Sequence, residues 1–87
     1  MPYNVVLGRK ADGDLAAMPS ANRRQILRAI YERLAVDPMG AGKPLRHTLK
    51  GCWRLRVGDW RVLYRVDDST VTVYVFSIAI RRDAYKG

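Results

Sequence analysis

Residues 52–64 of the chain alternate large apolar side chains with arginines, and the alternation is interrupted once, at Gly58 and Asp59. Two runs of period two around a Gly-Asp pair are typical of a tight β-hairpin, because glycine accepts the positive φ that a two-residue turn requires. The predicted register sets Val57 opposite Trp60, Arg56 opposite Arg61, Leu55 opposite Val62, and Arg54 opposite Leu63.

This register predicts a hairpin with one apolar and one basic face, because opposite residues share a face of a sheet. The apolar face carries Trp53, Leu55, Val57, Trp60, Val62, Tyr64 and Val66. The basic face carries Arg54, Arg56, Arg61 and Arg65. Like charges that face one another repel, so four grouped arginines indicate a site for anions. The alternative is a solvated face on which the arginine stems cover apolar surface.

Two other segments have the character of strands. Residues 3–7 are short, β-branched and aromatic, and residues 70–80 resume the alternation after an Asp67-Asp68-Ser69 turn. A loop of two or four residues keeps the apolar face continuous, whereas an odd loop would turn arginines into the core. The favoured register sets Val66 opposite Val71, Tyr64 opposite Val73, and Val62 opposite Val75. It sends Thr72, Tyr74 and Phe76 to the arginine face.

Two helices are predicted between the first strand and the hairpin. Residues 9–18 place Ala11, Leu15 and Met18 on one side. A second helix begins near Pro19, which suits a first turn, and ends at Asp37-Pro38. Its apolar face comprises Ile26, Leu27, Ile30, Tyr31 and Leu34. Residues 39–44 are predicted to be a loop. The expected fold is a single α+β domain over residues 1–87, with an N-terminal strand and an αα-hairpin packed on an antiparallel β-meander.

The charge of the chain is unevenly distributed. Lys and Arg number 16 against 8 Asp and Glu, and of the net charge of +8 the part up to Gly42 carries +2 and the remainder +6. Lys43, Arg46, His47 and Lys50 add positive charge just before the hairpin. A basic surface of this kind is typical of nucleic-acid binding, although an acidic protein partner would fit it equally well.

Cysteine usage and hydropathy indicate the compartment. The single cysteine, Cys52, cannot form an internal disulfide, and the chain has neither a signal-peptide pattern nor an apolar run of about 20 residues. We therefore expect a protein of the reducing cytoplasm that does not enter a membrane. No Cys/His spacing, phosphate-binding loop or dinucleotide fingerprint is present, so no metal or cofactor is expected.

Arginines beside aromatic side chains favour single-stranded RNA, because guanidinium groups bind phosphates and unstacked bases lie on aromatic rings. Cleavage without a metal would proceed by attack of the 2′-OH on the adjacent phosphate, with positive charge over the phosphorane. Arginine binds phosphate but scarcely titrates. His47 is the only histidine, which excludes a two-histidine mechanism. Tyr85 among arginines is expected to have a lowered pKa.

The chain also resembles a known family. The segments GCWRLRVGDWRVLYRVDD (51–68) and IRRDAY (80–85), with MPY at the start and GKPLR at 42–46, are similar to the RelE group of the RelE/ParE toxin superfamily. The resemblance implies a toxin of a type II toxin–antitoxin system that is held inactive by a RelB-like antitoxin. Once released, such a toxin enters the ribosomal A site and cuts the mRNA there.

The resemblance assigns roles by position. Arg54 and Arg56 match basic residues of the first hairpin strand, Arg61 matches the arginine at the scissile phosphate, Arg81 matches the transition-state arginine, and Tyr85 matches the tyrosine that stacks on or orients the substrate base. The further RNA-binding candidates are Lys43, Arg46, Lys50, Arg65 and Arg82.

The sequence also departs from well-studied members of the group. Those members have lysines where Arg54 and Arg56 stand, and Ile80 replaces a histidine or lysine found in many relatives. A catalytically weakened member, and a ParE-like inhibitor that acts on DNA gyrase by binding alone, therefore remain the alternatives.

Overall fold

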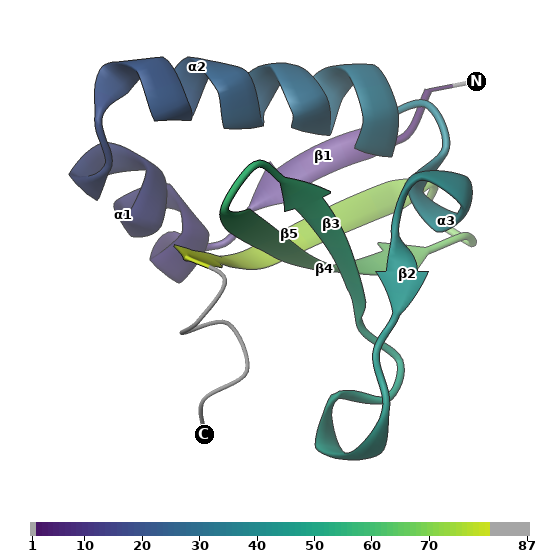
Figure 1. Ribbon diagram of the computed structural model, residues 1–87. Coiled ribbons are helices and arrows are strands. Elements are labelled where there is room, and N and C mark those ends of the chain that lie inside the picture. The colour runs from purple at the N-terminus through teal and green to yellow at the C-terminus, as the bar shows by residue number, and fades with distance from the viewer. Residues whose placement is uncertain (1, 81–87) are drawn as a thin grey trace.

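The computed structural model describes residues 2–80. A five-stranded sheet of order β1-β5-β4-β3-β2 lies under a layer of helices, as Figure 1 shows. The strands are β1 (Asn4–Leu7), β2 (Lys43–Pro44), β3 (Trp53–Val57), β4 (Trp60–Asp67) and β5 (Thr72–Ile80). Strand β1 runs parallel to β5, and the other neighbouring pairs are antiparallel. The α+β class and the β3–β4–β5 meander are thus as the pattern predicted.

The hairpin of β3 and β4 has the predicted register at every position. Val57 pairs with Trp60, Arg56 with Arg61, Leu55 with Val62 and Arg54 with Leu63. Gly58 occupies the turn at φ +58°, a conformation in which a side chain would be strained. Local turn chemistry therefore fixes the register of this pair.

The predicted register between β4 and β5 was wrong. Val66 pairs with Val73 and Tyr64 with Val75, and a β-bulge between Leu63 and Tyr64 then shifts the remaining pairs, so that Val62 meets Ile78. The connection has four residues, as one of the predicted loops had, but strand β4 continues to Asp67, one residue further than expected. Strand β5 therefore also begins one residue later, and the partner of each β4 residue before the bulge moves by two positions. An even shift keeps each side chain on its predicted face, and the bulge turns Ile78 into the core.

The helical layer consists of α1 (Arg9–Ala17), α2 (Ser20–Ala29) and a π-helical continuation, η1 (Ile30–Leu34). The two predicted helices form, with Ala11, Leu15 and Met18 buried as expected. Tyr31 was placed wrongly, because its side chain is 54% exposed. The core-facing residues Ile26, Ile30 and Leu34 recur every fourth residue. Because a π-helical turn contains more residues than an α-helical turn, residues with this spacing stay on the same side of the helix. Tyr31 then points to the outside.

Residues 39–44 are not simply a loop. A short helix, α3 (Pro38–Ala41), begins where Pro38 suits the first turn, and the carboxylate of Asp37 accepts a hydrogen bond from the backbone N–H of Gly40. Strand β2 follows and pairs with Trp53 and Arg54. The connection from β2 to β3 contains a 3₁₀ turn, η2 (His47–Leu49). These elements carry the chain from the helical layer to the edge of the sheet.

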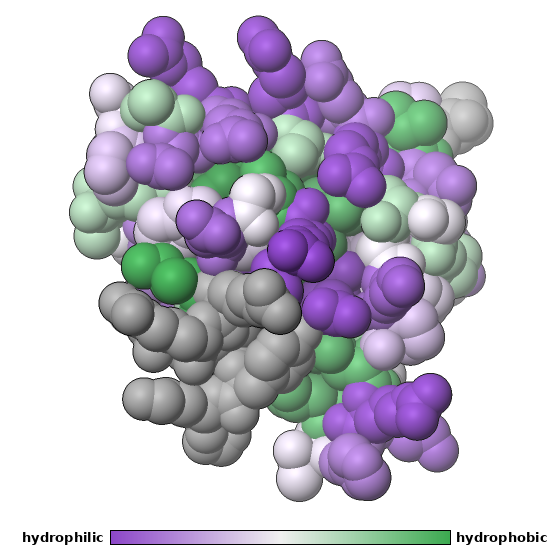
Figure 2. Space-filling view, in the orientation of Figure 1, coloured by the Kyte–Doolittle hydropathy of each residue, from purple (hydrophilic) through white to green (hydrophobic). Residues whose placement is uncertain are grey.

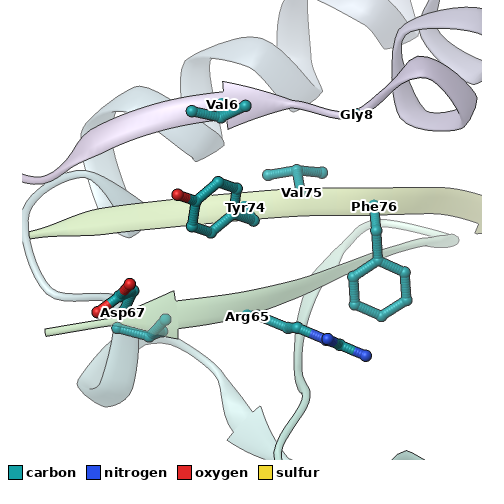
Figure 3. Close-up of a pocket in the computed structure, with 8 residues that line it drawn as sticks. Val6, Gly8, Arg65, Asp67, Tyr74, Val75 and Phe76 are labelled. Atoms are coloured by element: carbon teal, nitrogen blue, oxygen red, sulfur yellow. The ribbon is translucent and has the colours of Figure 1, made fainter. Parts of the chain in front are cut away.

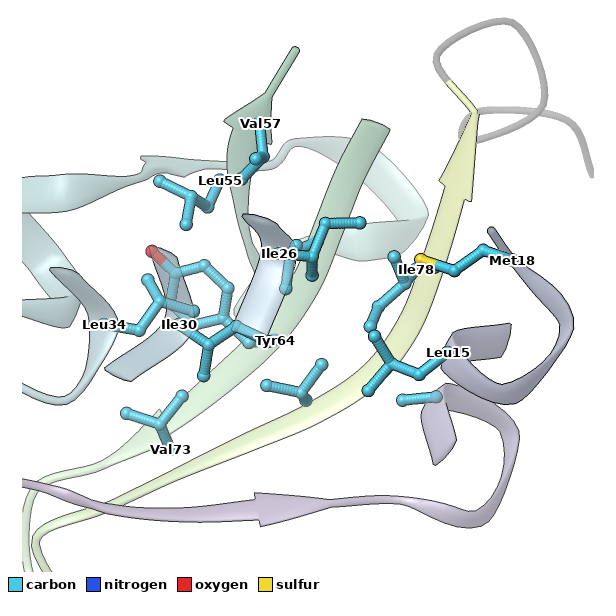
Figure 4. Packing of buried hydrophobic residues seen from close by; sticks show 13 residues of the cluster. Leu15, Met18, Ile26, Ile30, Leu34, Leu55, Val57, Tyr64, Val73 and Ile78 are labelled. Atoms are coloured by element: carbon cyan, nitrogen blue, oxygen red, sulfur yellow. The ribbon is translucent and has the colours of Figure 1, made fainter. Parts of the chain in front are cut away.

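The hydrophobic core lies between the helices and one face of the sheet, as Figure 4 shows. Tyr64, at the centre of β4, is fully buried, and its hydroxyl donates a hydrogen bond of 2.6 Å to the carbonyl of Pro38. Burial raises the pKa of Tyr64 to about 12. Within residues 2–80, no helix is long and apolar enough to cross a membrane.

Candidate functional site

The candidate site is the outer face of the sheet, which points away from the helices. Cross-strand pairing places Arg54 opposite Leu63, Arg56 opposite Arg61, and Arg65 opposite Tyr74. All of these side chains therefore lie on one face, and the predicted sidedness of the hairpin is confirmed. Their surroundings nevertheless differ, because the outer face has a cationic edge, a buried centre and an aromatic edge.

The cationic edge is a small hollow of about 170 Å³ that we call the cationic hollow. It lies where β3 runs beyond its short partner β2. The residues that line it are Arg33, Ala41, Gly42, Lys43, Arg54 and Arg56. Figure 2 shows strongly hydrophilic side chains gathered over this part of the molecule, near β2 and β3. Four positive side chains thus surround one space large enough for a small anion.

Gly42 allows the chain to pass close to β3 at this hollow. A Cβ atom at this position would collide with the hydroxyl of Tyr64 and the backbone carbonyl of Arg54. Because backbone cannot yield as a flexible side chain can, the position requires glycine. The close approach brings Lys43, the next residue, directly opposite Arg54.

Arg33 belongs to this hollow, and the sequence reasoning did not assign it to the site. It projects from η1 in the helical layer, whereas Arg54 and Arg56 come from the sheet. Helical spacing shows that Arg33 is a surface residue but not which part of the sheet it approaches. Only the tertiary fold brings Arg33 beside Lys43 and Arg54.

The centre of the outer face holds Arg61, which the sequence placed among the arginines of the basic face. Its side chain is only 2% exposed, and Leu63 beside it is also buried. Nε and Nη1 of Arg61 have no hydrogen-bond partner within the part of the chain that the structure describes. A buried guanidinium normally pairs with a carboxylate or with several acceptors. Two nitrogens of the Arg61 guanidinium therefore have unused hydrogen-bonding capacity at the centre of the outer face, within the described residues.

The aromatic edge forms a larger hollow of about 620 Å³, which we call the aromatic hollow. Its lining residues are Val6, Gly8, Arg65, Val66, Asp67, Tyr74, Val75 and Phe76. Figure 3 shows Tyr74 and Phe76 projecting from β5, with the guanidinium of Arg65 beside the Phe76 ring. The Arg65 Cζ atom lies 5.8 Å from the ring centroid, within the range of a cation–π contact.

Asp67 closes one end of the aromatic hollow. Its Oδ1 accepts hydrogen bonds from the Ser69 hydroxyl at 2.6 Å and from the Ser69 backbone N–H at 3.0 Å. The bond from the Ser69 hydroxyl is the main reason why the pKa of Asp67 is lowered. The carboxylate is consequently a fixed negative charge at the edge of a positive face.

The remaining predicted site residues are dispersed. Arg46 and Lys50 are exposed in the connection from β2 to β3, as is His47, which adopts φ +59°. Arg81, Arg82 and Tyr85 lie outside the described residues.

The described residues do not neutralise the positive charges of the site by ion pairs. Within residues 2–80, the one ion pair joins Lys10 and Asp14 at 2.9 Å, on α1 and away from the hairpin. In the same range, no group of His, Cys, Asp and Glu side chains could hold a metal ion. The described part of the site therefore offers cations and aromatic rings as its binding groups.

A comparison with protein families assigns the chain. The model of the family described as "ParE toxin of type II toxin-antitoxin system, parDE" matches residues 5–85. The chain belongs to this toxin family. It is thus a toxin of a type II toxin–antitoxin system, within the RelE/ParE superfamily that the sequence resembled.

In sequence, this toxin is similar to individual toxins of the RelE type. It is 35% identical over 86 residues to Toxin RelG of Mycobacterium tuberculosis, with 99% of each chain covered. It is 34% identical to Toxin RelE of the same organism, over 98% of this chain and 88% of the relative. Among solved structures, the toxin–antitoxin complex RelBE2 from M. tuberculosis matches with a TM-score of 0.88 and 33% identity, over 93% of this toxin and 100% of that chain.

Proposed function

We propose that this toxin is a ribosome-dependent endoribonuclease that cuts mRNA in the ribosomal A site and thereby stops translation. Its similarity to Toxin RelG and Toxin RelE supports the assignment to the RelE group, whose members cleave mRNA. The basic outer face of the sheet supplies a surface on which a polyanionic strand can lie. The activity would take place in the cytoplasm, where ribosomes translate.

The observation that carries this proposal is that Arg61 is buried without hydrogen-bond partners, among the described residues, for two of its nitrogens. A buried cation without a compensating partner costs several kcal/mol of folding free energy, and Nε and Nη1 of Arg61 have no partner within residues 2–80. A phosphate presents several oxygens that accept from a guanidinium fork. Binding of the scissile phosphate at Arg61 would supply the missing acceptors, with Arg56 directly opposite on β3.

The reaction would need no metal ion. The 2′-oxygen attacks the adjacent phosphorus, the bond to the 5′-oxygen breaks, and the products end in a 2′,3′-cyclic phosphate and a 5′-hydroxyl. Arg54, Arg56, Arg61 and Arg81 would stabilise the extra negative charge of the phosphorane. None of them is suited to proton transfer, because arginine stays protonated. That role falls to Tyr85, which also orients the base in this proposal, or to groups of the ribosome.

The partner that restrains the toxin would be a RelB-like antitoxin. The similar M. tuberculosis structure is that of a toxin–antitoxin complex. An acidic antitoxin segment laid over the outer face would neutralise Lys43, Arg54 and Arg56 and occupy the path of the RNA. Such binding would explain how the same face serves both inhibition and catalysis.

The test is induction of the toxin in bacteria followed by mapping of transcript ends. Wild-type toxin should produce cuts at positions fixed relative to codons, and Arg61→Met should abolish them while the variant stays folded. Arg28→Met removes an exposed arginine from α2, outside both hollows, and should leave cleavage intact. Loss of folding in Arg61→Met, or intact transcripts with wild-type toxin, would overturn the proposal.

The same induction tests the second candidate, inhibition of DNA gyrase by binding. The matching family model is described by the name ParE, which favours this candidate independently of the RelE relatives. Gyrase inhibition predicts DNA damage with uncut mRNA, whereas the endoribonuclease predicts the reverse. A catalytically weakened toxin would yield the codon-positioned cuts only slowly.

A further inference from the structure

We propose that the aromatic hollow is a base-binding subsite, in which one base of single-stranded RNA stacks on Tyr74 and on the guanidinium of Arg65. The hollow measures about 620 Å³, within the roughly 300–1,000 Å³ range of small-ligand sites. The subsite deepens the proposed function and rests on it, because an RNA strand must cross the outer face for a base to reach the hollow.

Tyr74 is exposed and is fixed by the sheet in a position where a base can stack on its ring. Tyr74 is 42% exposed although it belongs to a strand with a neighbour on each side, β1 and β4. Val6 lies directly opposite it on β1, and Arg65 lies directly opposite on β4. A tyrosine fixed on a paired strand loses little conformational freedom when a planar ligand lies against it.

Two aromatic rings reach this hollow because Tyr74 and Phe76 are two residues apart on β5 and therefore share the outer face. Leu63 pairs with Ser77 and Tyr64 with Val75, so Phe76 is the additional residue of β5. The bulge sets Ile78, and not Ser77, opposite Val62, so that Ile78 returns to the core after Phe76. Arg65 lies over the Phe76 ring, which leaves the other side of its planar guanidinium available to a base.

Charge distinguishes a base from a second phosphate as the occupant. Asp67 lines the hollow as a carboxylate with a lowered pKa, which repels phosphate but accepts hydrogen bonds from the N–H groups of a base edge. The cationic hollow and Arg61 lie on the same face, toward β3. Strands β3 and β5 are two strand spacings, or about 10 Å, apart across the sheet, and Arg61 and Arg65 are a further four residues, or about 13 Å, apart along β4. The backbone of one RNA strand can therefore lie on the cations while a base further along the same strand enters the aromatic hollow.

The experiment measures binding of two uncleavable probes to the full-length toxin. One is a short 2′-O-methyl oligoadenylate, whose blocked 2′ oxygen cannot attack the phosphate, and the other is an abasic polymer with the same number of phosphates. Tyr74→Leu should weaken binding of the oligoadenylate about tenfold, the effect of losing one stacked base. It should leave binding of the abasic polymer unchanged, and Tyr74→Phe, which keeps the ring, should restore the affinity.

Tyr31 provides the matched control, since it is also an exposed tyrosine but lies on η1 in the helical layer. Tyr31→Leu should bind both probes as the wild-type toxin does. Three results would overturn the subsite: unchanged oligoadenylate binding by Tyr74→Leu, an equal loss for the abasic polymer, or a loss of antitoxin binding without a loss of RNA binding. The last would identify the hollow as a protein contact.

Transcript mapping separates failure of the subsite from failure of the proposed function. Wild-type toxin that cuts mRNA, together with a Tyr74→Leu variant that binds oligoadenylate normally, would refute the subsite alone. Wild-type toxin that leaves mRNA uncut but binds oligoadenylate through Tyr74 would refute the proposed cleavage and support the subsite.

Discussion

The two faces of β3 and β4 come from one alternating sequence but serve different purposes. On the side toward the helices, Leu55, Val62 and Tyr64 are buried, and the Tyr64 hydroxyl has a partner in Pro38. On the outer side, Arg61 is equally buried, yet two of its nitrogens lack partners within residues 2–80. The first face satisfies its groups and stabilises the fold. The second face leaves buried hydrogen-bond donors without acceptors among the described residues, which is typical of a ligand-binding surface.

The largest expected effect is on stability, and it should differ between two neighbouring residues of β3 that point to opposite faces of the sheet. Leu55→Ala should lower the free energy of unfolding by about 2–5 kcal/mol, because it leaves a cavity in the core. Arg56→Ala, one residue later on the exposed side, should change it by less than about 0.5 kcal/mol. Denaturant titration of both variants checks this contrast, and equal destabilisation would mean that both faces contribute to the core.

The second prediction concerns the cost of burying Arg61. Arg61→Met should raise the free energy of unfolding by about 1–2 kcal/mol, because a buried cation without a partner is replaced by an apolar side chain of similar length. The same variant should lose RNA cleavage. Thermal and denaturant unfolding measure the gain, and a marked destabilisation would show that Arg61 supports the fold.

The third prediction uses the pKa of Tyr64. Burial raises this pKa from 10.0 to about 12, so the unfolded chain ionises first. The stability that Tyr64 contributes is therefore complete below pH 10.0 and is lost as the pH rises toward about 12.

Tyr64→Phe should lower stability at neutral pH by about 1–2 kcal/mol, because the Pro38 carbonyl loses its donor. The variant should also show a weaker decline over the alkaline window, and unfolding curves measured across that window test both parts. An unchanged alkaline decline in Tyr64→Phe would assign the titration to another group.

The smallest effect is expected at the cationic hollow. Arg33→Gln should weaken RNA binding about two- to fivefold, the contribution of one exposed ion pair, and the loss should diminish at high salt. Arg28→Gln removes an equal charge from α2, away from the hollow, and serves as the control. If the two variants weaken binding equally, net charge alone accounts for the effect.

Local sequence signals predicted the register of one strand pair correctly but not the pairing of the others. The β3–β4 register followed from Gly58, because a two-residue turn leaves one way to pair the strands. The β4–β5 register did not follow, since a four-residue connection fits more than one strand length and nothing in the sequence marked the bulge at Phe76. The parallel pairing of β1 with β5 joins residues 4–7 to residues 72–75, and no local pattern encodes a contact between segments so far apart in the sequence.

The alternating pattern by itself determined which residues of the hairpin face the helices and which face away, because side-chain direction in a strand has a period of two. It also determined the excess of positive charge on the outer face. Only the tertiary structure decided that Arg61 is buried, that Arg33 joins Arg54 at one hollow, and that Tyr74 and Arg65 share another. These relations depend on contacts between distant segments and on close packing, which no short stretch of sequence specifies.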